Sequence, residues 1–126
     1  MSAKPLPVYI GKTPPATPAG GRLLRLKMLK KLRTEGGANS DERILFLFRM
    51  HAQTLADQGF TPETCTLHVE FIDWVPYEMQ SMLPALHDSG HEIFGGNAIR
   101  AYLKDKEKSG APVIEKDAPL ILTLEP

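Results

Sequence analysis

Prolines and glycines divide this chain into short segments, and this division constrains the fold more than any other feature of the sequence. Five of the 11 prolines lie within the first 18 residues, where they prevent residues 11–21 from forming a helix. Gly59, Gly90 and Gly110 each end a later segment. The 126 residues therefore fit one small domain built from several short elements.

Composition excludes several classes of protein. The 42% of hydrophobic residues suffices for one modest core, which excludes a multidomain enzyme. The longest fully apolar run, Ile44 to Phe48, is far shorter than the roughly 20 residues that cross a bilayer. The single cysteine, Cys65, cannot form an intrachain disulfide and indicates a reducing compartment. Because the N-terminus also lacks a signal-like apolar segment, we expect a cytoplasmic protein that does not enter membranes.

The charged residues are distributed unevenly, although their sum is zero. Up to Thr34 the chain carries eight bases and no acid, whereas residues 35–126 carry 15 acids and seven bases. The basic N-terminal segment, residues 1–34, is therefore the part of the chain suited to an anionic partner.

Residue patterns predict an α+β fold, in which a small sheet is flanked by helices, with residues 1–110 as the domain and 111–126 as a C-terminal tail. The predicted elements are a strand at Leu6–Ile10, a helix at Arg22–Thr34, a helix capped by Asn39 or Ser40 that ends at Gly59, a strand at Thr66–Phe71, a helix from Pro76 to about His87, a helix at Ala98–Lys108 capped by Asn97, and a strand at Leu120–Leu124.

Periodicity supports three of these elements. Apolar residues at three-to-four spacing favour the first helix, in which six of the 12 residues from Arg22 to Arg33 are basic. The second helix is expected to bury Ile44, Leu47, Phe48 and Leu55. Alternation in the middle strand is expected to bury Cys65, Leu67, Val69 and Phe71 and to leave Thr66, His68 and Glu70 on the other face.

The most informative stretch is Pro7–Thr13, because a tyrosine near a strand end is followed directly by glycine and lysine. The sequence Tyr9-Ile10-Gly11-Lys12-Thr13 resembles the second half-motif of the GIY-YIG nuclease superfamily, a strand with Y-[IV]-G-K-[TSA] followed by a loop and an arginine-bearing helix. A second similarity lies downstream, where Leu67–Glu78 resembles the apolar strand, D-x-W-[IV]-P and glutamate of the restriction-endonuclease branch.

The resemblance implies hydrolysis of a DNA phosphodiester with one divalent cation. Glu78 would hold Mg²⁺, Tyr9 would position or deprotonate the attacking water, and Arg25, with Arg22 second, would balance the charge of the transition state. The residues expected to bind nucleic acid are Lys12, Arg22, Lys27, Lys30, Lys31 and Arg33.

The first half-motif of the family, a strand with G-[IVL]-Y, has no counterpart, since only eight residues precede Tyr9. A partner chain, such as a second copy in a homo-oligomer, or an upstream segment could supply this strand; otherwise the chain is a trimmed, degenerate or non-catalytic relative. Tyr9 also fits an ordinary strand tyrosine, Glu78 a solvated first-turn glutamate, and the basic run a solvated helix face.

Two functions of other classes compete with the nuclease. One is a non-enzymatic nucleic-acid or protein interaction adaptor, related to mobile elements or defence, that docks through the basic helix. The other is a winged-helix regulator, with Asn97–Lys108 as the recognition helix and Leu120–Leu124 as the wing. His87 and His91 have the spacing of a helical metal pair, but no third ligand can be named.

Overall fold

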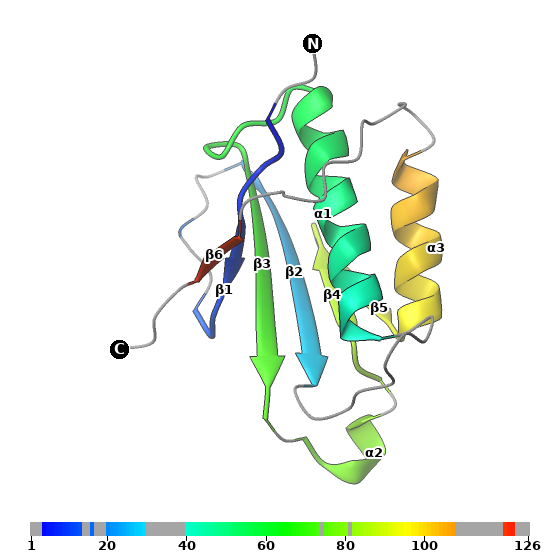
Figure 1. The fold of residues 1–126 in the computed structure, drawn as a ribbon. Coiled ribbons are helices and arrows are strands. Elements are labelled where there is room, and N and C mark those ends of the chain that lie inside the picture. Colours follow the sequence, from blue (N-terminus) through cyan, green and yellow to red (C-terminus); the bar gives the residue numbers. More distant parts are fainter. Residues whose placement is uncertain are drawn as a thin grey trace.

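The computed structural model describes residues 4–13, 16, 20–29, 40–73, 75–80, 82–107 and 120–122. Within these residues the chain forms one six-stranded mixed sheet and three helices, which confirms the predicted α+β class (Figure 1). In chain order the elements are β1 (Val8–Ile10), β2 (Arg22–Leu29), α1 (Asp41–Asp57), β3 (Cys65–Ile72), α2 (Tyr77–Gln80), β4 (Ala85–Asp88), β5 (His91–Phe94), α3 (Gly96–Glu107) and β6 (Leu120–Leu122).

The strands lie in the order β5-β4-β2-β3-β1-β6. β2 and β3 are parallel neighbours joined through α1, and β4 and β5 form an antiparallel hairpin beside β2. β1 is parallel to β3 on one side and to β6 on the other, so both of its edges are occupied. The final strand therefore brings part of the predicted C-terminal tail into the sheet.

Helices α1 and α3 cover one face of the sheet and contact each other (Figure 1). The core lies between them and the sheet, where alternate residues of β1, β2 and β3 meet apolar residues of both helices. Its largest fully buried apolar side chains are Phe48, Leu24, Leu26, Met28, Ile44, Leu55, Leu67, Leu86, Ile99 and Leu103. No helix in the described part of the chain is long and apolar enough to cross a membrane.

The predicted helix at Arg22–Thr34 is wrong over its described part, because Arg22–Leu29 is strand β2. The segment Leu-Leu-Arg-Leu-Lys-Met-Leu fits a period of two as well as three-to-four spacing. As a strand it puts Leu24, Leu26 and Met28 into the core and pairs along its full length with β3. Pairing with a buried neighbour overrides local helix preference here. Residues 30–39 lie outside the described part.

The predicted helix from Pro76 to His87 is also wrong beyond its first turn. α2 ends at Gln80, and Pro84, whose preceding peptide bond is cis, leads directly into β4. Ser89 and Gly90 both have positive φ, 48° and 89°, which suits a two-residue hairpin turn. This turn produces β5, a strand that the sequence patterns did not predict.

Helix α1 and strand β3 confirm the two best-defined predictions. Ser40 caps α1, and its hydroxyl accepts a hydrogen bond from the Arg43 backbone N–H at 3.3 Å. The four residues expected on the buried face of α1 are all buried. On β3, however, Phe71 is only partly buried, and Thr66 and His68 are buried although they alternate with the core residues. α3 begins at Gly96, so Asn97 lies within the helix instead of capping it.

The face of the sheet opposite α1 and α3 is called the second face here. No helix of the described residues packs across it, and α2 lies only at its edge, beyond the carboxyl ends of β2 and β3 (Figure 1). By strand alternation and register the second face carries Tyr9, Arg25, Lys27, His68, Glu70, Ala85, His87, Glu92 and Phe94.

Candidate functional site

Two of the three predicted catalytic residues lie in one row across the second face. Tyr9 on β1 and Arg25 on β2 are both register partners of His68 on the intervening strand β3. Neighbouring strands are about 4.8 Å apart, so the row spans about 10 Å from Tyr9 to Arg25. No pattern in the sequence pointed to His68 as the residue between them.

Polar contacts within the molecule hold this row. The Arg25 guanidinium donates to Glu70 Oε1 at 2.7 Å and to the Lys12 carbonyl oxygen at 3.4 Å. His68 is fully buried, and its Nε2 donates to the Gly11 carbonyl oxygen at 2.6 Å, since a carbonyl oxygen only accepts. The charge of Arg25 is thus matched by Glu70 within the fold.

Glu78, the third predicted catalytic residue, is not brought to this row. It is an exposed residue of α2, whereas His68 lies four residues before the end of β3 at Ile72. At about 3.3 Å per residue, roughly 13 Å separate the row from the strand end alone. Among the described residues no group of three His, Cys, Asp or Glu side chains could hold a metal ion. Glu78 therefore stands apart from the row formed by Tyr9, His68 and Arg25.

Arg22 takes part in a buried polar cluster on the helix-covered side. Its Nε and Nη2 donate to the two carboxylate oxygens of Asp88 at 2.8 and 2.5 Å, and the Tyr102 hydroxyl donates to the same carboxylate at 2.5 Å. The Arg22 guanidinium also lies 5.9 Å from the centre of the Phe60 ring. The hydrogen bond to Asp88 raises the pKa of Arg22, and burial together with Asp88 raises the pKa of Tyr102 to about 12. The Arg22 guanidinium is thus engaged by Asp88 within the fold and is not directed to a phosphate ligand.

The other residues predicted to bind nucleic acid are dispersed. Lys12 is exposed directly after β1, and Lys27 lies half-buried on the second face. Lys30, Lys31 and Arg33 lie outside the described residues. The described part of this set is therefore divided between the two faces of the sheet, with Arg22 on the helix-covered side and Lys27 on the second face.

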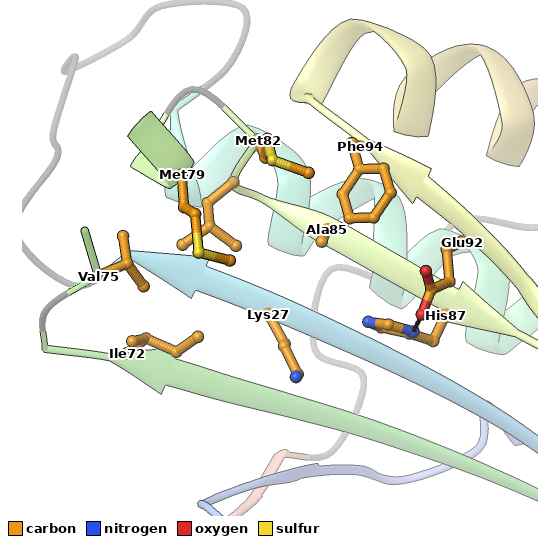
Figure 2. A pocket seen from close by; sticks show the side chains of 10 residues that line it. Lys27, Ile72, Val75, Met79, Met82, Ala85, His87, Glu92 and Phe94 are labelled. Atoms are coloured by element: carbon orange, nitrogen blue, oxygen red, sulfur yellow. Dashed lines mark ion pairs between the residues drawn. The ribbon is translucent and has the colours of Figure 1, made fainter. Parts of the chain in front are cut away.

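The structure reveals a groove on the second face that the sequence patterns did not indicate. It encloses about 290 Å³ between the carboxyl end of β2, the β4–β5 hairpin and the segment around α2 (Figure 2). We call it the sheet-face groove. Its lining residues are Lys27, Ile72, Val75, Met79, Met82, Leu83, Ala85, His87, Glu92 and Phe94. The paired methionines after Pro76 were the only signal in the sequence that could have pointed to it.

Three polar side chains stand among the apolar residues of the sheet-face groove. His87 Nδ1 lies 3.2 Å from Glu92 Oε1 across the β4–β5 hairpin. The other ring nitrogen, Nε2, points away from Glu92, toward the side of the groove on which Lys27 lies (Figure 2). His91 is the register partner of Asp88 and lies on the opposite face of the hairpin, so the helical spacing of His87 and His91 does not bring them together.

The exposed large hydrophobic side chains of the described residues lie in or beside the sheet-face groove. Over the described residues the exposed large hydrophobic side chains are Tyr77, Met79, Met82 and Phe94, which are between 38% and 85% exposed. Three of them line the groove, and Tyr77 belongs to α2 beside it.

Cys65 lies elsewhere and is buried. Burial raises the pKa of its thiol to about 11, so it is not a nucleophile at neutral pH.

Comparisons with known proteins add no identification. No protein family matches the chain, and neither the curated proteins nor the solved structures contain a significant match.

Proposed function

We propose that this protein is a non-enzymatic protein-interaction module, and that its sheet-face groove receives an apolar side chain of a partner. The observation that carries the proposal is the clustering of Met79, Met82, Phe94 and Tyr77 around one groove. Contiguous exposed apolar surface on a small domain marks a place where another molecule binds. Because Cys65 is unpaired, the proposal includes a reducing compartment, the cytoplasm.

The groove has the properties of a binding site more than of an active site. Burying one leucine or phenylalanine side chain there would contribute about 1.5–3 kcal/mol. Methionine side chains adapt to different shapes, which suits a surface that accepts a partner's side chain. Its polar groups are a lysine and a histidine–glutamate pair, without a nucleophile activated by an adjacent base.

Selection from a phage-displayed peptide library tests this function. Enriched peptides should contain apolar residues and bind the wild type at least tenfold more tightly than the double variant Met79→Ser/Phe94→Ser. Both positions are exposed, so this variant should fold normally. The matched control is Ala101→Ser on the exposed side of α3, which should bind like the wild type. If all selected peptides bind the double variant equally well, the groove is not the interaction site.

A second candidate is the Mg²⁺-dependent DNA endonuclease implied by the GIY-YIG resemblance. The row of Tyr9, His68 and Arg25 favours it, because it brings a phenol and a guanidinium onto one face. This candidate requires Glu78 to act from α2. Within the described sheet the edge strands to which a partner strand could add are β5 and β6, since β1 is paired on both sides.

A plasmid-nicking assay with and without Mg²⁺ tests the second candidate. Nicking by the wild type should disappear in Glu78→Ala and in Tyr9→Phe, while DNA affinity measured by gel shift stays nearly unchanged. Glu63→Ala, at an exposed position before β3, is the control. Absence of Mg²⁺-dependent nicking in the wild type, or its survival in Glu78→Ala, would refute the catalytic assignment.

A further inference from the structure

We propose that the sheet-face groove binds the C-terminal residue of its partner, with the apolar side chain against the methionines and the free α-carboxylate on the Lys27 ammonium group. This inference rests on the proposed interaction function and names the chemistry that the groove selects.

Lys27 is the first residue that favours binding of a carboxylate in the groove. It is half-buried on β2 and lines an otherwise mainly apolar groove. Within the described residues its ammonium group makes no ion pair or hydrogen bond. Its register partner on β3, Glu70, is engaged by Arg25 at 2.7 Å. An unpaired cation beside apolar surface is complementary to an anion on an apolar body.

His87 keeps the carboxylate of Glu92 away from Lys27. Its Nδ1 lies 3.2 Å from Glu92 Oε1, and because a carboxylate only accepts, the proton of the neutral ring is on Nδ1, while Nε2 faces the groove (Figure 2). Glu92 is the one carboxylate that lines the groove, and its pairing with His87 holds it at the β5 side, across the hairpin from Lys27. The charge pattern of the groove thus places an anion at Lys27, away from Glu92.

The size of the groove fits one residue. At the roughly 30 Å³ that a water molecule occupies in the liquid, about 290 Å³ corresponds to about ten water molecules. This volume is sufficient for a leucine side chain with its free carboxylate. A longer ligand would have to extend out of the groove over the exposed side chains of Met79 and Phe94.

A C-terminal residue supplies the apolar side chain and the carboxylate together, which an internal acidic residue does less well. Its side chain and its carboxylate share one Cα, so both can enter a single small groove. In an extended internal segment, an apolar residue and a neighbouring Asp or Glu point to opposite sides. The free carboxylate is therefore the anion that matches the close spacing of Lys27 and the apolar lining.

Peptide binding followed by two-dimensional NMR tests the inference. The probe is the tetrapeptide Gly-Gly-Ser-Leu with a free C-terminus, compared with the same peptide carrying a C-terminal amide. The acid should bind at least about tenfold more tightly at low salt, because a charge-assisted hydrogen bond is lost in the amide. Lys27→Met should remove this preference, Lys27→Arg should keep it, and Lys104→Met, exposed on α3, is the matched control.

The outcomes separate the inference from the function on which it rests. Equal affinities of the acid and the amide for the wild type, or a preference that survives in Lys27→Met, would overturn the carboxylate site while leaving the interaction module intact. If neither peptide shifts the groove resonances, the interaction function itself fails. Octanoate supplies the same carboxylate on a free apolar acid, and binding of octanoate without the peptide acid would overturn the assignment to a protein C-terminus.

Discussion

Asp88 offers the sharpest test of what holds this fold together. Its carboxylate is 1% exposed and accepts two hydrogen bonds from Arg22 and one from Tyr102. Asp88→Asn keeps the side-chain shape but removes the charge that balances the Arg22 guanidinium. Breaking one partner of a buried ion pair costs about 3–5 kcal/mol. Because the Arg22 side chain is 21% exposed, we expect the lower end, about 3 kcal/mol at pH 7.

The loss of unfolding free energy in Asp88→Asn should become smaller as the pH is lowered. Burial by itself would raise the pKa of Asp88, but the hydrogen bonds from Arg22 and Tyr102 outweigh it and hold the pKa below its ordinary value of 3.8. A carboxyl group with a lower pKa in the folded state stabilises the fold fully above its unfolded pKa. That contribution disappears as the pH falls through the folded-state pKa. The difference between wild type and Asp88→Asn should therefore be complete at pH 7 and shrink below about pH 4.

Urea denaturation followed by circular dichroism at several pH values measures this difference. Asp105→Asn, exposed on α3, is the control and should change the free energy of unfolding by less than about 0.5 kcal/mol. Equal stabilities of Asp88→Asn and wild type at pH 7 would refute the reasoning. So would a difference that stays constant or grows as the pH is lowered.

Three further predictions address the core, a helix cap and the cysteine. Phe48→Ala removes a fully buried ring from α1 and should lower the free energy of unfolding by about 3–5 kcal/mol in urea titrations; a loss below 1 kcal/mol would contradict the core assignment. Ser40→Ala should cost about 1 kcal/mol, measured the same way, whereas Ser40→Asp should retain most stability; equal losses would argue against the cap. Cys65, with its pKa raised to about 11, should react with a disulfide reagent at pH 8 only after unfolding in urea; rapid labelling of the folded protein would contradict its burial.

The elements that could be predicted from the sequence are those with one consistent period. α1 has apolar residues at helical spacing and a serine cap, and apolar and polar residues alternate in β3 from Cys65 to Phe71. Strand β2 could not be predicted, because its leucines satisfy the helical and the strand period at once. Its conformation depends on β3, a neighbour more than 30 positions away in the chain. The Ser89-Gly90 turn was a local signal for the β4–β5 hairpin that the apparent helix after Pro76 concealed.

The second face could be predicted only in part. Tyr9 and Arg25 were expected to act together, and the register with His68 does bring them into one row. Glu78 was expected beside them, but the distance along β3 depends on strand geometry that spacing in the sequence does not report. The sheet-face groove draws its lining from β2, the end of β3, the α2 segment and the hairpin. No single stretch of sequence carries that combination.

The position of β1 between β3 and β6 has a consequence for how the chain folds. Val8 pairs with Leu67 on one side and with Leu120 on the other, so this strand is completed only by segments far from it in sequence. Closing such long loops is entropically costly, and pairings of this kind slow folding. The β2–α1–β3 unit needs shorter closures, so we expect it to form first and to serve as the template on which β1 and then β6 assemble.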